Sequence, residues 1–348
     1  MVTRIGLDLG YANITLSDAA CNVYREPSVA LVQKESRSDV SRIVAIGNEA
    51  LSPDPSIPYS NNAMLVRPFK NGILFDSQLT GEIIKNAISV VSVKDKLRCV
   101  VGVPSDFLPK QEKELCQMLT AAGVDMSVLV ARPVAAIIGA GYSPTMSVIS
   151  VNIGAQATEI AVLHNGKVLS LSRELIGGED FDRAVKQFVL DQGDVNISLS
   201  VARAIKEKLG AVWKGKPNEC IDIEGTLALT GNKLKMNVTT EDIVGVFEEP
   251  LNRLISSVVN AVKKIPADAV EAIFANGIVL TGGGSDLYGM PTLIEKVLGV
   301  PVSHPSESID CVAKGLARIN AFIPEKQKVA NKNLTLDIAA IYEAGKKV

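Results

Sequence analysis

Residues 5–16 read IGLDLGYANITL, and residues 149–160 read ISVNIGAQATEI. Aligned without a gap, Asp8 of the first stretch falls on Asn152 of the second. Each stretch predicts an apolar strand that ends in a polar residue, a turn that contains glycine, and a returning strand. Backbone N–H groups at tight turns bind phosphate oxygens, and a nearby carboxylate can hold a metal ion through water. The pair therefore indicates a two-part phosphate clamp in which one copy has an acid and the other an amide.

The composition is that of a globular protein with room for two or more domains. Of the 348 residues, 47% are hydrophobic and 21% are charged, and the formal net charge is −2. This balance gives no general attraction to nucleic acid or anionic lipid, and the 4% aromatic content offers little surface for base stacking. The five cysteines form no CxxC pair, so we expect reduced thiols in a cytoplasmic protein. We also expect no signal peptide and no membrane-spanning segment.

The first half of the chain alternates strands with helices. Its expected elements are a hairpin at residues 3–18, strands at 42–46 and 99–103, and helices at 77–90, 110–123 and 133–141. The rest of residues 27–76 is rich in Pro, Ser and Asn, and we expect it to be irregular.

The second half repeats this plan. Its expected strands are 147–153, hairpin strands that follow it up to residue 172, 219–236 and 278–281. Its expected helices are 178–191, 198–212, 241–264 and 310–322. Thr239 or Thr240 is the expected cap of the helix at 241–264. Strands that alternate with helices in both halves predict α/β layers with mixed sheets, and the repetition predicts a cleft between duplicated domains.

Six motifs in order along the chain resemble one family. They are DLGYANI (8–14), REPSVAL (25–31), RPFKNGILFD (67–76), VGVPS (101–105), IGGEDFD (176–182) and IVLTGGGSDLYGM (278–290). Together they resemble the MreB actin-like proteins, the bacterial rod-shape branch of the actin/Hsp70/sugar-kinase ATPase superfamily. The resemblance extends to about residue 323.

The resemblance implies an actin-like fold of two duplicated domains around a nucleotide cleft. Domain I would span residues 1–146, with a small subdomain within 27–76, and domain II residues 147–309, with a small subdomain at about 190–250. Residues 310–348 would return a helix to domain I and end in a basic tail.

The resemblance also implies ATP or ADP with Mg²⁺ as ligands, and it assigns their contacts. The nucleotide-binding positions would be Asp8, Gly10, Tyr11, Ala12, Asn13, Gly154, Ala155, Gln156, Gly177, Gly178, Lys206, Glu207, Gly282, Gly283 and Gly284. Asp8 would hold the metal indirectly, through water. For Lys206 and Glu207 the alternative is a solvated helix face. Lys70 either supports the site electrostatically or is a surface lysine.

Three catalytic positions depart from the family pattern. The family's second turn reads DIGGGTTE, whereas this chain has Asn152 in place of the Asp and Ala157 in place of the first Thr. Arg132 replaces the family's Glu before the Pro of EPMAAAIGAG. An arginine stays protonated and cannot act as a base, and an amide lacks the anionic charge that hydrated Mg²⁺ prefers. Mg²⁺ binding is therefore doubtful, and Arg132 could bind the polyphosphate in its place.

These substitutions predict strongly reduced ATP hydrolysis. One interpretation is weak residual activity, and the other is a pseudo-ATPase that acts by assembly. In-line phosphoryl transfer to water needs an oriented nucleophile and neutralised phosphate charge, and both are weakened here. An active ATPase of the superfamily, chaperone-like or plasmid-segregating, is the alternative function, and a small-molecule kinase ranks last.

The expected partners follow from the resemblance. They are copies of the same chain in filaments of paired protofilaments, and other MreB paralogues. The loop at residues 93–97 is polar where relatives can be apolar. The tail segment LTLDIAAIYEA, residues 334–344, either lies as an amphipathic helix on a membrane or partner, packs on its own domain, or is disordered.

Overall fold

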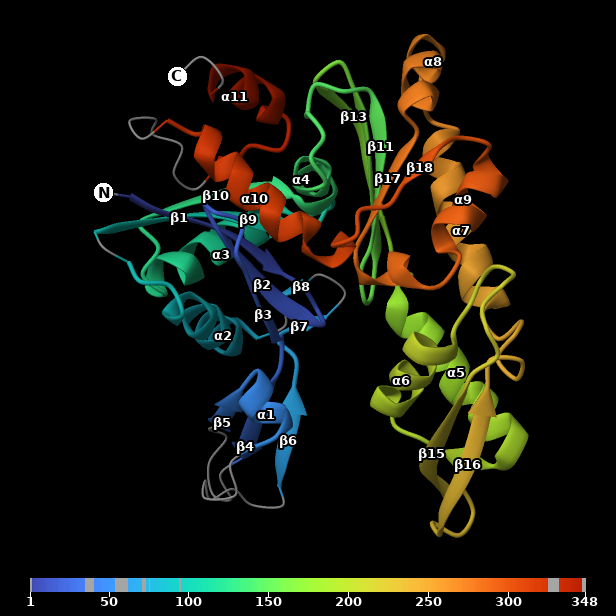
Figure 1. The fold of residues 1–348 in the computed structure, drawn as a ribbon. Helices are drawn as coiled ribbons and strands as arrows, with labels where there is room; N and C mark the ends of the chain where they lie inside the picture. The colour runs from blue at the N-terminus through green and yellow to red at the C-terminus, as the bar shows by residue number, and fades with distance from the viewer. Residues whose placement is uncertain are drawn as a thin grey trace. The chain divides into compact units, whose positions relative to one another are not determined.

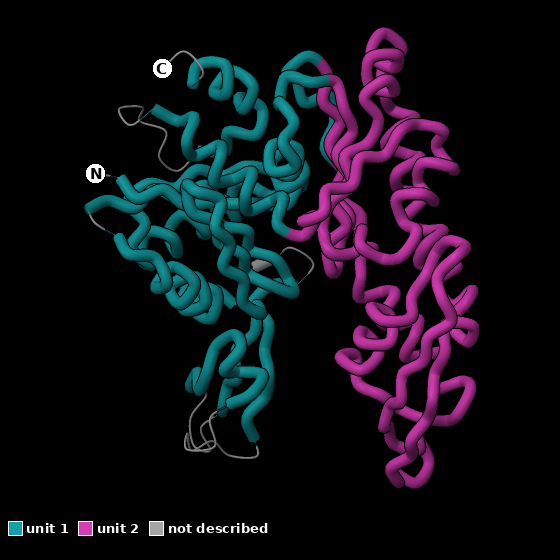
Figure 2. Tube along the Cα trace, viewed as in Figure 1, with its two compact units in different colours: residues 1–146, 165–171, 310–348 teal, residues 147–164, 172–309 magenta. Residues whose placement is uncertain are grey.

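The computed structural model describes residues 2–34, 41–53, 62–70, 73–74, 76–93, 95–324 and 332–345. Its contacts divide the chain into two compact units, which Figure 2 shows in teal and magenta. Unit 1 comprises residues 1–146, 165–171 and 310–348, and unit 2 comprises residues 147–164 and 172–309. The predicted domain boundaries, small subdomains and nucleotide cleft stay predictions.

Unit 1 contains a six-stranded mixed sheet together with helices and smaller sheets (Figure 1). Its elements are β1 (Val2–Leu9), β2 (Asn13–Asp18), β3 (Val23–Pro27), β4 (Ala30–Lys34), β5 (Ser41–Ile46), α1 (Asn48–Leu51), β6 (Ala63–Val66), β7 (Phe69–Lys70), β8 (Ile73–Leu74), α2 (Ser77–Ser89), β9 (Lys96–Val103), α3 (Pro109–Ala121), β10 (Met126–Ala131), α4 (Arg132–Gly139), α10 (Cys311–Phe322), β19 (Lys332–Asn333) and α11 (Ile338–Gly345).

Unit 2 repeats the combination of sheet and helices. Its elements are β11 (Val148–Ile153), β12 (Thr158–His164), β13 (Lys167–Glu174, which begins among the residues of unit 1), α5 (Gly178–Gly193), β14 (Val195–Asn196), α6 (Leu199–Leu209), β15 (Cys220–Leu227), β16 (Lys233–Thr239), α7 (Glu248–Val262), α8 (Ala267–Asn276), β17 (Ile278–Thr281), the 3₁₀ turn η1 (Gly283–Asp286), α9 (Met290–Leu298), β18 (Val302–Ser303) and the 3₁₀ turn η2 (Ser308–Asp310).

The two main sheets share one topology. In unit 1 the order is β19-β10-β9-β1-β2-β3, with β1 antiparallel to β2 and parallel to β9. In unit 2 the order is β13-β12-β11-β17-β18, with β11 antiparallel to β12 and parallel to β17. β1 and β11 therefore hold equivalent central places, each with a hairpin partner on one side and a parallel strand on the other. This agreement is the structural form of the sequence repeat.

Alternation along β1 places its two faces against different helices. Ile5 and Leu7 share a buried core with Leu79 of α2 and Leu119 of α3. The intervening Gly6 faces α10, where a Cβ would overlap the backbone of residues 313–317. Successive side chains of a strand point to opposite faces, so a pattern of apolar residues around glycine lets α10 lie directly on the sheet.

A buried arginine anchors the end of α10 to β9. The side chain of Arg98 is only 1% exposed. Its guanidinium donates to Oδ1 of Asn320 at 2.8 Å and to the backbone oxygens of Ile323 at 2.8 Å and Pro324 at 3.2 Å. A cation is favourable at the negative end of a helix dipole, and a further bond from Nη2 to the backbone oxygen of Asn320 at 3.2 Å satisfies a carbonyl that the last turn of the helix leaves without a partner.

The predicted start of the helix at 241–264 is wrong. The helix α7 begins at Glu248, and Thr239 ends strand β16 instead of capping a helix. The N–H and hydroxyl of Thr239 both donate to Asp242 Oδ2 at 2.7 Å, which forms a local turn. Gly245 then has φ +86°, a left-handed conformation that interrupts a right-handed helix.

The prediction that residues 27–76 are irregular, apart from 42–46, is also wrong. β4 pairs with both β5 and β6 in a three-stranded sheet, and β7 pairs with β8. Pairing between distant segments stabilises these short strands, and a local pattern does not reveal it. Other elements that were not predicted include β3, β10, α8 and α9. Residues 35–40, 54–61, 71–72 and 75 lie outside the described residues.

The tail helix α11 packs on its own unit. Ile338, Ala339 and Ile341 are buried. The ring of Tyr342 packs edge to face on that of Phe322 of α10, with 4.7 Å between the ring centroids. Figure 1 shows α11 beside α10. This packing supports the alternative in which the tail packs on its own domain, and membrane contact stays a prediction. No helix in the described part of the chain is long and apolar enough to cross a bilayer. Lys94 of the predicted polar loop and tail residues 325–331 and 346–348 lie outside that part.

Candidate functional site

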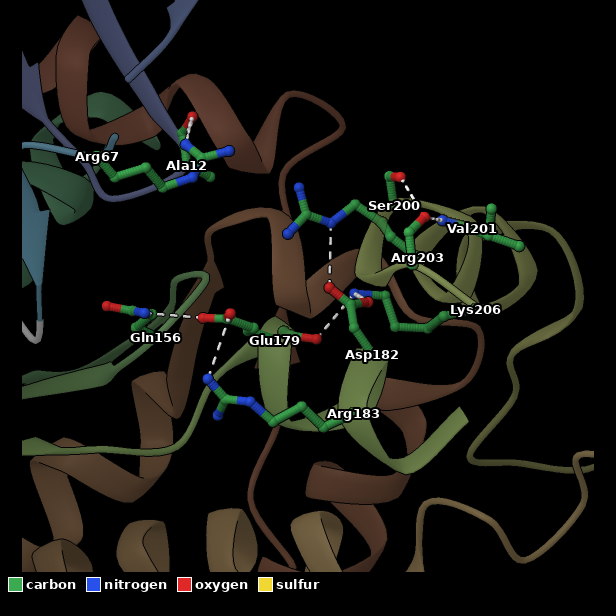
Figure 3. Close-up of polar contacts among 12 residues, drawn as sticks. Ala12, Arg67, Gln156, Glu179, Asp182, Arg183, Ser200, Val201, Arg203 and Lys206 are labelled. Carbon is green, nitrogen blue, oxygen red and sulfur yellow. Dashed lines mark hydrogen bonds and ion pairs between the residues drawn. The ribbon is translucent and has the colours of Figure 1, made fainter. Parts of the chain in front are cut away.

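The first turn lies between β1 and β2 and is held from outside by side chains. A Cβ at Gly10 would lie 2.6 Å from the backbone oxygen of Asn13, so the turn requires glycine there. The hydroxyl of Ser28 donates to the oxygen of Gly10 at 2.7 Å. Arg67 donates to the oxygen of Tyr11 at 3.0 Å and to that of Ala12 at 3.2 Å; Figure 3 labels Arg67 and Ala12. The backbone carbonyls of residues 10–12 thus all accept hydrogen bonds from the side chains of Ser28 and Arg67.

Arg67 also stacks on the turn's aromatic side chain. Its guanidinium carbon lies 5.1 Å from the centroid of the Tyr11 ring, a cation–π arrangement. The sequence prediction did not assign Arg67 or Ser28 to the site. Both residues belong to motifs that carried the family resemblance, RPFKNGILFD and REPSVAL, and that membership was the available signal.

Arg132 and Asp8 form an ion pair at the base of the first turn. The Nε of Arg132 lies 2.9 Å from Oδ1 of Asp8, and its Nη2 donates to the backbone oxygen of Leu9 at 2.8 Å. The two side chains are only 13% and 17% exposed. Asp8 is the next-to-last residue of β1 and Arg132 is the first residue of α4, so strand pairing and helix packing bring together two residues 124 positions apart. Each group neutralises the charge of the other.

The amide of Asn152 is built into the packing of unit 2. It lies near the end of β11, is 6% exposed, and accepts a hydrogen bond from the Thr281 hydroxyl at 3.2 Å. Gly282, the residue that follows the end of β17, has φ +85°, and a Cβ there would lie 2.8 Å from Oδ1 of Asn152. Glycine is therefore required at position 282 by conformation and by space. The second turn is closed by Gly154, whose N–H donates to the oxygen of Ala157 at 2.9 Å.

The start of α5 docks against the second turn. The N–H of Gly178 donates to the oxygen of Gly154 at 2.9 Å, and the N–H of Glu179 donates to the oxygen of Ala155 at 2.8 Å. Gln156 closes the contact, because its amide donates to Oε2 of Glu179 at 2.8 Å (Figure 3). A Cβ at Gly177 would lie 2.7 Å from the backbone of Ala155, which explains the glycine at this approach. The second turn and the IGGEDFD segment therefore pack directly against each other.

Lys206 points toward α5. Its Nζ lies 2.7 Å from Oδ1 of Asp182 as an ion pair, and it donates to the oxygen of Gly178 at 3.0 Å. Arg203 donates to the other oxygen of Asp182 at 3.1 Å. Asp182 is fully buried, so these two cations neutralise a carboxylate that would otherwise be costly to bury. Sequence reasoning missed Asp182 and Arg203. Glu207 is exposed on α6.

The glycine run after β17 is packed on the chain itself. A Cβ at Gly284 would overlap the side chain of Ile153. The run is followed by a small polar cluster around His304. Its Nε2 lies 2.9 Å from Oγ of Ser285 and 3.2 Å from Oδ1 of Asp286. Burial alone would raise the pKa of Asp286, but the hydrogen bonds from His304 and Ser308 hold the pKa below its ordinary value of 3.8. Lys70, assigned to the site or to the surface, is exposed on β7.

The donor set does not fit a hydrated magnesium ion. Mg²⁺ is held by carboxylate oxygens, directly or through its water shell. Asp8 already has a guanidinium at 2.9 Å, and the position of the family's second acid is the amide of Asn152. Among the described residues there is no cluster of three or more His, Cys, Asp or Glu side chains that could hold a metal ion.

Solved structures of other proteins share this architecture. MreB5 of Spiroplasma citri bound to ADP matches with a TM-score of 0.81 at 20% identity, over 89% of this chain and 94% of that one. A MamK double helical filament matches with a TM-score of 0.78 at 19% identity, over 93% of this chain and 100% of that one. The chain therefore has an actin-like fold, as the sequence predicted.

Sequence comparison defines the family. The MreB/Mbl protein family model matches residues 2–328. The cell shape-determining protein Mbl of Bacillus cereus (strain ATCC 10987 / NRS 248) is 28% identical over 318 residues, 89% of this chain and 93% of the relative. The cell shape-determining protein MreB of Escherichia coli (strain K12) is also 28% identical over 318 residues, 89% of this chain and 91% of the relative. The chain belongs to the MreB/Mbl family, which confirms the resemblance seen in the motifs.

Proposed function

We propose that this chain is an actin-like cytoskeletal protein that binds an adenine nucleotide, assembles with copies of itself, and hydrolyses ATP slowly or not at all. The MamK match is a double helical filament, and the MreB5 matches carry ADP and AMPPNP. These likenesses, together with the family, support assembly and nucleotide binding as functions of this chain. The proposal also includes that the filaments are cytoplasmic, consist of paired protofilaments and support cell shape. Other MreB paralogues are proposed as partners.

The observation that carries the slow-hydrolysis part is the contact between Arg132 and Asp8. A general base must accept a proton from the attacking water, and a guanidinium stays protonated at any physiological pH. The contact at 2.9 Å also holds Arg132 against Asp8. Ala157, at the position of the family's water-positioning threonine, has no hydroxyl. An active chaperone-like or plasmid-segregating ATPase is therefore not favoured.

The test is phosphate release and sedimentation, measured together with and without ATP and magnesium. We expect the chain to pellet, with phosphate release about 100-fold or more slower than that of Escherichia coli MreB assayed in parallel, since general base catalysis contributes about 10²–10⁴-fold. Turnover equal to that of the relative would overturn the slow-hydrolysis claim. A chain that never pellets, under any nucleotide condition, would overturn the assembly claim.

A further inference from the structure

We propose that this chain binds the polyphosphate of an adenine nucleotide without magnesium, with N–H groups of the Arg132 guanidinium as the donors to the phosphate oxygens. The inference rests on the proposed function, and it specifies the chemical form of the ligand: the metal-free nucleotide. It follows from the disagreement between the family's metal-dependent chemistry and the side chains that surround the predicted phosphate-binding turns.

The first part of the argument is the state of Asp8. A hydrated dication is attracted by a carboxylate that carries its full charge, and a neighbouring guanidinium opposes it. Arg132 lies 2.9 Å from Asp8, and the exposure of the two side chains, 13% and 17%, limits screening by solvent. A magnesium ion bound through Asp8 would have to displace Arg132 or tolerate its repulsion.

The second part concerns the acids beside the second turn. Glu179 accepts from Gln156 at 2.8 Å and lies 3.3 Å from Arg183. Asp182 is fully buried between Lys206 and Arg203. Each carboxylate therefore has cationic or amide partners from the chain itself. Asp8 in unit 1, and Glu179 and Asp182 in unit 2, are thus each engaged by side chains of the chain, so none of these three carboxylates is open to a magnesium ion.

The third part is the suitability of Arg132 for phosphate. Guanidinium presents five N–H donors in a planar fork that matches phosphate oxygens, and it keeps its charge at all working pH values. Arg132 is also the first residue of α4, at the positive end of the helix dipole, which favours anions. Its Nε and Nη2 contacts to Asp8 and Leu9 fix the position of the guanidinium at the base of the first turn.

The experiment is a titration of the full chain with ATP and with ADP by calorimetry, in excess magnesium and in EDTA. We expect the wild-type Kd values in the two conditions to agree within about threefold, because the metal contributes no required contact. We expect Arg132→Gln to weaken binding in EDTA by about tenfold or more, the usual effect of losing a charge-assisted hydrogen bond. Magnesium should restore part of that loss, because Asp8 is then no longer neutralised.

A matched control is Lys233→Gln. It removes one cation from an exposed ion pair with Glu224 in the ribbon of β15 and β16, and we expect it to change neither Kd. Wild-type binding that weakens tenfold or more in EDTA would overturn the inference. Filaments without nucleotide binding in either condition would overturn the inference and leave assembly standing. A chain that neither binds nucleotide nor pellets would overturn both proposals. Circular dichroism of each variant separates lost binding from lost folding.

Discussion

Asp286 shows at the scale of one residue how local hydrogen bonds set a pH response. Ser308 donates to its carboxylate at 2.6 Å and Nε2 of His304 lies at 3.2 Å, and together they outweigh burial and lower its pKa below 3.8. A lowered folded-state pKa means that the ionised form stabilises the fold. That stabilisation is fully present above the unfolded-state pKa and is lost as the pH falls through the lower folded-state value.

The prediction is that Asp286→Asn lowers the melting temperature most at neutral pH. The difference from wild type should shrink as the pH is lowered below about 4, when the wild-type carboxylate becomes protonated. Thermal denaturation from about pH 7 to about pH 3 measures it. In a Ser308→Ala background the pH dependence should be smaller, since one of the donors is absent. A difference that grows toward acid would contradict this assignment.

Residue chemistry at the candidate site could be predicted only in part. The types of Arg132, Asn152 and Ala157 were informative because the family motif gave each position a role. The contact of Arg132 with Asp8 could not be predicted, because it depends on how α4 is placed against the end of β1. Likewise, the sequence alone leaves open whether Lys206 points to solvent. In the structure its ion pair with the buried Asp182 holds it against α5.

Among the elements, the pair α4 and α10 depends on glycine at their contact. A Cβ at Gly139 would overlap the backbone carbonyl of Cys311, and a Cβ at Gly315 would overlap that of Ala135. The two helices can lie this close only because each offers a position without a side chain at the crossing. Backbone atoms, unlike the ends of flexible side chains, cannot move aside cheaply.

We therefore expect Gly139→Ala to destabilise the protein by about 3 kcal/mol or more, in the range of severe overpacking. Gly81→Ala is the matched control, because Gly81 lies within α2 and a Cβ there meets nothing within 4 Å. Alanine should stabilise that helix by about 0.5–1 kcal/mol. Urea denaturation measures both changes. Equal effects of the two substitutions would show that the close helix contact does not govern stability.

Helices with clear apolar periodicity were predicted well, and those broken by local turn chemistry were not. The predicted helices at 77–90 and 178–191 correspond to α2 and α5. The predicted start near Thr240 failed because Asp242 and Gly245 form turns that the apolar pattern does not register. The short strands β4 and β6 were missed because their stability comes from pairing across some thirty residues of chain.

For the whole molecule, slow hydrolysis should be reversible by restoring three side chains. The variant that combines Arg132→Glu, Asn152→Asp and Ala157→Thr returns the base, the acid and the water-positioning hydroxyl of the family pattern. We expect phosphate release with magnesium to rise by about 100-fold, within the range of general base catalysis. A coupled phosphate assay measures it, with Lys233→Gln as control. No gain in a folded variant would mean that these positions have other roles.

The fold as a whole was the most predictable level. The duplicated strand–turn–strand pattern and six ordered motifs sufficed to predict an actin-like fold, which the structural matches confirm. The pattern works at this scale because a buried central strand in each half must be apolar and must end where the chain turns. What it leaves open is each pairwise contact at the turns, which depends on angstrom-level packing of segments far apart in sequence.

The anchoring of α10 to β1 and β9 has a consequence for how the chain is made. The sheet of unit 1 begins with Val2, yet the helix that covers one of its faces is not complete until Phe322. A ribosome would thus release all of residues 147–309 before Arg98 and Gly6 receive their partners. The nascent first unit must wait with the parts of β1 and β9 that α10 later covers still exposed, and the inserted second unit can complete its own core during that wait.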